Sequence, residues 1–156
     1  MKPKAYVETT VISYLAASPS RDIVVAAHQQ LTHEWWERRD RFELVVSQAV
    51  VDEVSRGGAA MAARRLALLA QIPVLDLGDT VNEFARALLR SHAVPSNANL
   101  DAVHIAVAAV NHVSYFVTWN CTHIANAAVR GKIEEACRSA GLPTPTICTP
   151  EELMEP

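Results

Sequence analysis

The sequence has no run of apolar residues that approaches the roughly 18 residues needed to cross a membrane. It has only three cysteines, Cys121, Cys137 and Cys148, without the spacing of a disulfide framework or a structural zinc site. It lacks a basic N-terminal region followed by an apolar segment, so we expect no secretory signal. Together these absences predict a cytoplasmic protein with reduced thiols and no membrane segment.

The chain also lacks an excess of positive charge. Its formal net charge is -3 and its isoelectric point is near 6.0. This balance excludes a protein that coats nucleic acid non-specifically, although a nuclease with an acidic active site remains compatible with it. Charged residues make up 20% and hydrophobic residues 50% of the sequence, which excludes a disordered chain. The length predicts one domain that spans residues 1–156.

Strand-like and helix-like segments alternate along the whole chain. The predicted strands are short and apolar and cover residues 4–8, 44–46, 73–77, 115–118 and 145–148. The predicted helices lie between them and cover residues 11–17, 22–39, 48–56, 59–71, 79–91, 99–110 and 125–140. This alternation predicts a single α/β domain in which helices flank a central parallel sheet of about five strands, with right-handed connections.

Small polar residues predict where several helices begin. Asn99 is expected to cap the helix that carries Asp101 in its first turn, where free N–H groups and the helix dipole favour a carboxylate. Thr9 and Thr10 are expected to cap the first helix, and Ser47 the helix after the second strand.

Three acidic residues and one asparagine fall at equivalent places in this pattern. Glu8 ends the first strand, Glu53 faces inward on the helix after the second strand, and Asp101 opens the helix before the fourth. Asn120 follows the fourth strand. If the first and fourth strands are neighbours, these side chains meet outside the carboxyl ends of the strands, where open α/β sheets bind ligands. Oxygen ligands suit Mg²⁺ or Mn²⁺, which can activate water and stabilise charge at a phosphodiester.

Each of these residues, taken alone, has a simpler interpretation. Asp101 suits the first turn of any helix, a strand-end Glu8 is usually solvated, and Glu53 could pair with a nearby arginine. His104 is most often a histidine of the core or surface, so we assign it no catalytic role at this stage. Only the occurrence of all four polar residues in order favours a metal site.

Four segments resemble, in order, the motifs of PIN domains: YVETT at 6–10, VDEV at 51–54, LDAVHIA at 100–106 and VTWN at 117–120. The resemblance is greatest to the VapC-like ribonucleases, the toxins of bacterial toxin–antitoxin pairs, and it spans nearly the whole chain. It implies a parallel sheet wrapped by helices, cleavage of RNA with Mg²⁺ or Mn²⁺, frequent homodimers and inhibition by a cognate antitoxin protein.

Two positions depart from the usual pattern of this family. Glu8 and Asn120 stand where the family usually has aspartate, so the formal negative charge of the predicted site falls by one. We therefore expect weaker metal binding. The run WNCTHIAN at 119–126 resembles a PIN subgroup in which this asparagine is built in, which favours a variant site over an inactive one.

The residues and the resemblance together predict a metal-dependent endoribonuclease that is the toxin of a type II toxin–antitoxin pair. The predicted catalytic and metal-binding residues are Glu8, Glu53, Asp101 and Asn120. Predicted supporting residues order the acids by hydrogen bonds or contact substrate phosphate, and they are Thr9, Thr10, Thr118 and His123. The alternative hypothesis is a catalytically weakened PIN-like module that binds RNA or a protein without cutting.

Overall fold

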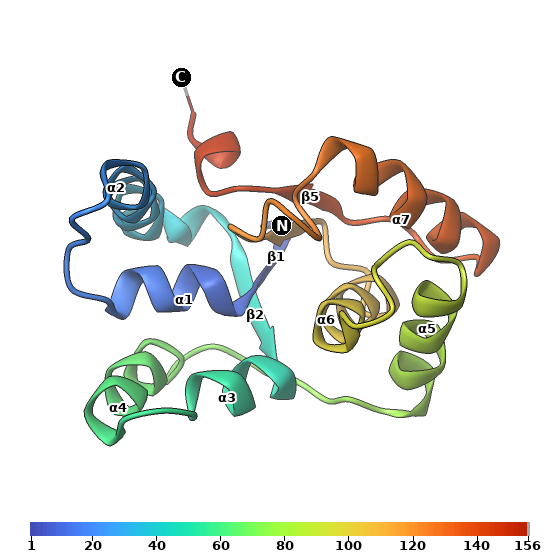
Figure 1. Cartoon of the computed structure of the whole chain (residues 1–156), viewed down its shortest axis with the longest axis horizontal. Coiled ribbons are helices and arrows are strands. Elements are labelled where there is room, and N and C mark those ends of the chain that lie inside the picture. The colour runs from blue at the N-terminus through green and yellow to red at the C-terminus, as the bar shows by residue number, and fades with distance from the viewer. Residues whose placement is uncertain (156) are drawn as a thin grey trace.

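A computed structural model, which describes residues 1–155, has a sheet of five parallel strands between two groups of helices (Figure 1). The strands lie in the order β3-β2-β1-β4-β5, so the first strand of the chain is at the centre. Their bounds are Lys4–Val7 (β1), Glu43–Ser47 (β2), Val74–Leu75 (β3), Tyr115–Val117 (β4) and Thr146–Cys148 (β5). The predicted α/β fold with a five-stranded parallel sheet is confirmed.

Seven α-helices connect the strands, with short 3-10 turns at Arg39–Arg41 and Glu151–Leu153. The helices are Thr9–Ala16 (α1), Ile23–Glu37 (α2), Gln48–Val54 (α3), Ala59–Leu68 (α4), Asp79–Arg90 (α5), Asn99–Val110 (α6) and Ala127–Ser139 (α7). In Figure 1, α1 to α4 lie to the left of the strands and α5 to α7 to the right. Within residues 1–155, no helix is long and apolar enough to span a membrane.

The order of the strands creates a switch point beside β1. From β1 the chain adds β2 and then β3 on one side of that strand. It then passes through α5 and α6 to add β4 on the other side of β1, and through α7 to add β5 beyond β4. Because right-handed crossovers that run in opposite directions place their helices on opposite faces, the two helix groups separate. The first and fourth strands are therefore neighbours, and residues after β1 and β4 lie where ligands of such sheets bind.

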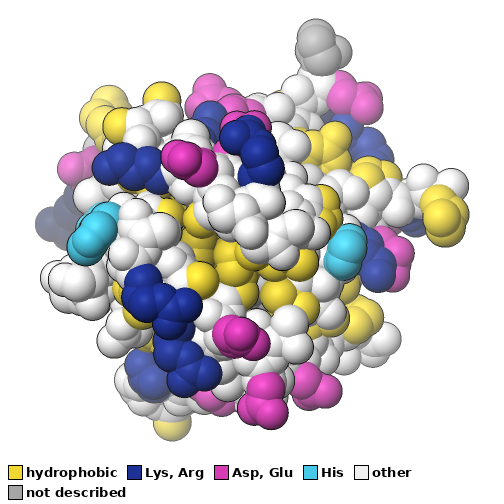
Figure 2. Space-filling model, turned by 90° about the vertical axis from the view of Figure 1, so that its right-hand side faces the viewer, with side chains coloured by type: hydrophobic (Ala, Val, Ile, Leu, Met, Phe, Trp, Pro, Cys, Tyr) yellow, Lys and Arg dark blue, Asp and Glu magenta, His cyan; other side chains and the backbone are white. Residues whose placement is uncertain are grey.

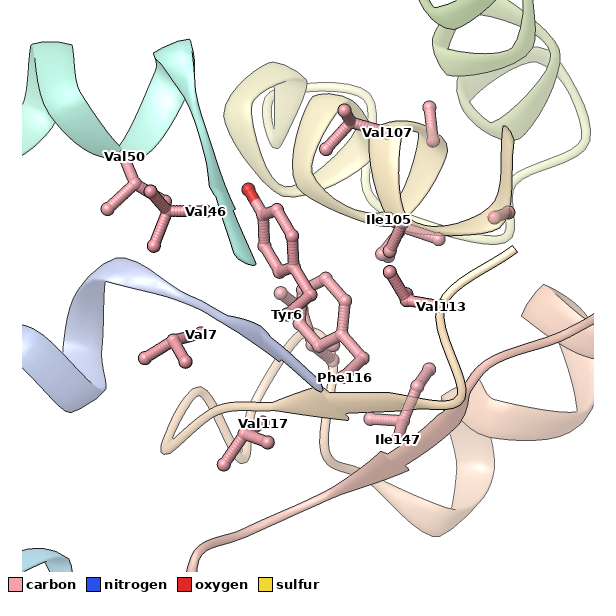
Figure 3. Close-up of a cluster of buried hydrophobic side chains, with 14 of the residues drawn as sticks. Tyr6, Val7, Val46, Val50, Ile105, Val107, Val113, Phe116, Val117 and Ile147 are labelled. Atoms are coloured by element: carbon pink, nitrogen blue, oxygen red, sulfur yellow. The ribbon is translucent and has the colours of Figure 1, made fainter. Parts of the chain in front are cut away.

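The core around the switch point is built from large side chains of the central strands and of α6. Tyr6 of β1 and Phe116 of β4 are fully buried and stack with ring centroids 5.1 Å apart. Figure 3 shows Tyr6 between Val46 and Ile105, with its hydroxyl pointing away from β1. Helix α6 is apolar almost all round and largely buried because it packs against α5 as well as the core.

Two helix starts differ from the prediction. Helix α6 begins at Asn99, with the preceding alanine in the cap position, so the expected cap by Asn99 is wrong. Helix α1 is capped by Glu8, whose carboxylate accepts a hydrogen bond from the Thr10 N–H at 2.9 Å, and not by the threonines. Ser47 does hold the cap position of α3, but its side chain makes no capping hydrogen bond. An acid of the predicted site therefore also fixes the start of α1.

A matched pair of leucines tests this packing. Leu88 of α5 is 0% exposed, whereas Leu66 of α4 is 38% exposed. We expect Leu88→Ala to lower the free energy of unfolding by about 2–5 kcal/mol, because it leaves a cavity in the core. The control Leu66→Ala should change it by less than about 0.5 kcal/mol. Urea denaturation measures both, and equal losses would contradict the burial described.

Candidate active site

Glu8 lies directly beyond β1 and is only 4% exposed. Its backbone N–H donates to the carbonyl of Val117 at 3.0 Å and so continues the pairing of β1 with β4. Its carboxylate accepts hydrogen bonds from the Thr10 N–H and hydroxyl and, at 2.9 Å, from the Thr118 hydroxyl. All three fall on Oε2, which leaves Oε1 for another partner.

Burial dominates the electrostatics of Glu8. Loss of solvent raises the pKa of its carboxyl above the usual range, and the charge of His104 and the hydrogen bonds from Thr10 and Thr118 offset this only in part. Ionised Glu8 is therefore held at a free-energy cost in the folded protein. A cation bound at Oε1 would reduce that cost.

Glu53 lies on the inward face of α3 with its side chain 23% exposed. Its Oε1 accepts a hydrogen bond from the Thr9 hydroxyl at 3.0 Å and contacts Nε2 of His104. Burial raises the pKa of this carboxyl, but the hydrogen bond and charge of His104, the Thr9 hydroxyl and the charge of Arg56 together lower it below its usual value. The side chain that contacts the Glu53 carboxylate is thus His104 and not an arginine.

Asp101 and Asn120 meet as their positions predicted. The Asn120 side-chain amide donates to Oδ1 of Asp101 at 3.2 Å, and Nδ1 of His123 lies 2.9 Å from Oδ2. Oδ1 of Asn120 also accepts a hydrogen bond from the His123 backbone N–H at 3.0 Å. The Asn120 N–H in turn donates to the Thr118 hydroxyl at 2.9 Å, and this same hydroxyl donates to Glu8. A continuous hydrogen-bonded path therefore joins Glu8 to Asp101.

The loop that carries Asn120 is anchored by the residue before it. The indole N–H of Trp119 donates to the Thr32 hydroxyl of α2 at 2.7 Å, and its ring stacks on His28 with centroids 4.1 Å apart. The Trp119 backbone N–H donates to the Thr10 hydroxyl at 2.9 Å. These contacts fix the end of β4 against α1 and α2.

The predicted residues thus form two hydrogen-bonded groups, one joining Glu8 to Asp101 and the other around Glu53. Within residues 1–155, no three His, Cys, Asp or Glu side chains form a cluster that could hold a metal ion. The donors nevertheless fit Mg²⁺ or Mn²⁺ chemically, because they are carboxylate and amide oxygens and Glu8 keeps one oxygen unused. A cation would compete with Asn120 and His123 for Asp101.

One residue of this region, His104, was not predicted to have a role there. It is 1% exposed on α6 and connects Glu53 to Tyr6 through its two ring nitrogens. The available signal was a histidine three residues after Asp101 in an otherwise apolar helix. That spacing places both side chains on the same side of the helix.

A separate groove lies on the face formed by α5 and α7. It has a volume of about 470 Å³ and is lined by small and charged side chains that include Ala87, Lys132 and Ala136. Figure 2 shows hydrophobic side chains exposed in a hollow on this side of the molecule. None of the predicted site residues lines this groove.

The opposite pKa shifts of two glutamates give a test of the site's electrostatics. Because the pKa of Glu8 is raised on folding, the folded protein binds this proton more tightly than the unfolded chain does, and stability falls as pH rises above the ordinary carboxyl range. We expect Glu8→Gln to increase the free energy of unfolding at pH 7 in chelator. The gain should vanish below about pH 4, where the carboxyl is protonated in both states.

Glu53→Gln is the matched control, with the opposite sign. Its lowered pKa means that ionised Glu53 stabilises the folded protein at neutral pH, and that this stability is lost as pH falls through the folded pKa. The substitution should therefore decrease the free energy of unfolding at pH 7. Urea denaturation across pH measures both variants, and a destabilised Glu8→Gln protein at pH 7 would contradict the assignment.

Comparison with known proteins places this geometry in a family. The profile described as PIN domain matches residues 5–120, and no curated protein matches significantly. Among solved structures, VapC20 of Mycobacterium tuberculosis, described as a Sarcin-Ricin loop cleaving toxin, is 17% identical with a TM-score of 0.61, over 76% of this chain and 91% of that chain. VapBC2 of Rickettsia felis, bound to a DNA fragment from their promoter, is 13% identical with a TM-score of 0.60, over 94% of this chain and 98% of that chain. These likenesses concern the fold, whereas the profile match includes all four predicted site residues, and the chain therefore belongs to the PIN domain family.

Proposed function

We propose that this PIN domain is a metal-dependent endoribonuclease and the toxin of a type II toxin–antitoxin pair. The observation that carries the proposal is the placement of Glu8, Asp101 and Asn120 on one hydrogen-bonded path at the switch point beside β1 and β4, with Glu53 next to it. The likeness to VapC20, a Sarcin-Ricin loop cleaving toxin, supports RNA as the substrate.

In this proposal Glu8, Glu53 and Asp101, assisted by Asn120, hold one or two Mg²⁺ or Mn²⁺ ions. When bound, such a cation lowers the pKa of an attacking water and stabilises negative charge at the phosphodiester. The chain's own residues orient the ligands, since threonine hydroxyls bind the carboxylates of Glu8 and Glu53. We propose that His123, which is partly exposed beside Asp101, contacts a substrate phosphate.

Electrostatics support the need for a cation. The carboxylates of Glu8, Glu53 and Asp101 repel the phosphates of RNA, and the chain as a whole is negative at -3. Arg56 is an exposed cation at the end of α3, close enough to influence the pKa of Glu53. We propose that it contributes to positioning RNA phosphates beside the acids.

The proposed partners follow from the same relatives. The likeness to VapBC2 supports a cognate antitoxin protein, and the resemblance to VapC-like toxins supports a homodimer. The reading frame next to the gene should encode a small protein that co-purifies with this chain and inhibits its cleavage of RNA. Size-exclusion chromatography with light scattering measures the mass of both species.

Asp101→Asn tests the proposed site directly. The substitution removes a charged oxygen ligand while keeping the shape of the side chain, so cleavage of a mixed RNA pool should fall about 100-fold or more in Mn²⁺ or Mg²⁺. Asp79→Asn is the matched control, because Asp79 also lies in the first turn of a helix, α5, outside the site. Chelator should abolish cleavage by the parent and the control. Unchanged cleavage by Asp101→Asn, with a folded protein, would refute the assignment.

Asn120→Asp tests the departure from the family pattern. The new carboxylate adds charge for a cation but cannot donate to Oδ1 of Asp101 as the amide does. We expect tighter Mn²⁺ binding by calorimetry and faster cleavage at limiting Mn²⁺. Cleavage by Asn120→Asp and none by the parent would favour the alternative, a module that binds RNA without cutting it. Slower cleavage by Asn120→Asp would show that the asparagine is required.

A further inference from the structure

A chain of buried hydrogen bonds leads from the sheet to Glu53. The Ser47 hydroxyl at the end of β2 lies 2.7 Å from the Tyr6 hydroxyl, which lies 2.6 Å from Nδ1 of His104. Nε2 of the same histidine contacts Oε1 of Glu53. The chain therefore connects β2, β1, α6 and α3, and Glu53 is its partly exposed end.

The hydrogen between His104 and Glu53 can be placed on the histidine. Ionised Glu53 can only accept, so Nε2 of His104 carries the hydrogen between them. Burial raises the pKa of Tyr6 far above its usual value, so the phenol keeps its proton. The Tyr6 hydroxyl lies between Nδ1 of His104 and the Ser47 hydroxyl, so it can donate to one of them and accept from the other. Each buried polar atom of the three supporting side chains thus has a partner.

Stability alone is a poor reason for this arrangement. Ser47, Tyr6 and His104 are each almost completely buried, and burying polar groups costs free energy that their hydrogen bonds recover with only a modest net gain. Ser47 also holds the cap position of α3 without making the capping hydrogen bond. Its hydroxyl is instead within hydrogen-bonding distance of Tyr6. The side chains are arranged around one carboxylate of the proposed metal site.

The side chains that contact Glu53 bind only one of its two carboxylate oxygens. His104 and Thr9 both bind Oε1, so Oε2 is left for a ligand. Glu8 shows the same pattern, because its supporting hydrogen bonds all fall on one oxygen. Partners that hold one oxygen of a ligating carboxylate orient the other, and losing such partners typically weakens metal binding by about 10- to 100-fold.

We propose that His104, held by Tyr6 and Ser47, is a positioning residue that orients Glu53 toward the bound cation. The inference rests on the proposed function and adds a role for three residues outside the predicted metal ligands. His104 contacts neither substrate nor cation in this arrangement. It acts through Glu53.

The test compares two substitutions of the same residue in the full chain. His104→Leu fills the site but cannot bind Glu53, whereas the amide nitrogen of His104→Gln can still donate near the position of Nε2. We expect His104→Leu to weaken Mn²⁺ binding in calorimetry by about 10-fold or more and to lower kcat without changing KM for RNA. His104→Gln should recover most of the Mn²⁺ affinity. Tyr6→Phe removes the hydroxyl that contacts Nδ1 of His104 and should give an intermediate loss of Mn²⁺ affinity.

Two controls separate positioning from loss of structure. Gln29→Leu removes another buried polar side chain, one that bonds to the chain near Ser18 and Ser20, and it should shift Tm without changing Mn²⁺ affinity. In a Glu53→Gln background, His104→Leu should cause no further loss of Mn²⁺ affinity, because the two residues act as one unit. An additive loss would overturn the inference.

The outcomes distinguish this inference from the proposed function. A parent protein that neither binds Mn²⁺ nor cuts RNA would refute the function, and the inference would fall with it. A parent that binds Mn²⁺, with the same affinity in His104→Leu, would overturn the inference alone. If His104→Leu and His104→Gln lose equal Mn²⁺ affinity, in proportion to the fall in their Tm values, the role of His104 is purely structural. That result would also overturn the inference.

Discussion

The pairing of β1 with β4 is the constraint on which the candidate site depends. Because parallel neighbours end at the same edge of a sheet, the residues that follow these strands are brought together although they are more than 100 positions apart in sequence. The N–H of Glu8 continues the ladder by donating to Val117, and the N–H of Thr118 continues it by donating to Cys148. The Thr118 hydroxyl then lies between Glu8 and Asn120 and holds both.

The acids at this edge are under opposing electrostatic influences. Glu8 is deeply buried and its pKa is raised, whereas Glu53 is partly exposed beside His104 and its pKa is lowered. Strongly perturbed pKa values cluster at functional sites, although structural ion-pair networks also produce them. The folded chain stabilises both carboxylates through neutral hydroxyls of threonines and one histidine.

The architecture could be predicted from the sequence because the strands and helices alternate with clear hydrophobic periods and because the motifs follow in order. The caps could not. Ala98 holds the cap position of α6 because its carbonyl accepts from the Ala102 N–H, and Glu8 holds that of α1 because its carboxylate accepts from the Thr10 N–H. The role of His104 could not be predicted for a different reason. Its partners Tyr6 and Glu53 are 98 and 51 positions away, so its role depends on contacts that no local pattern contains.

The two departures from the family pattern each make hydrogen bonds at the site. Glu8 caps α1 with its carboxylate and also accepts from the Thr118 hydroxyl across the strand pair. Asn120 presents an N–H to Asp101 where an aspartate would present a second negative charge. Repulsion between these neighbours is thus replaced by a hydrogen bond. Under the proposed function, the same exchange removes one charge that would attract Mg²⁺ or Mn²⁺ and stabilises the metal-free fold.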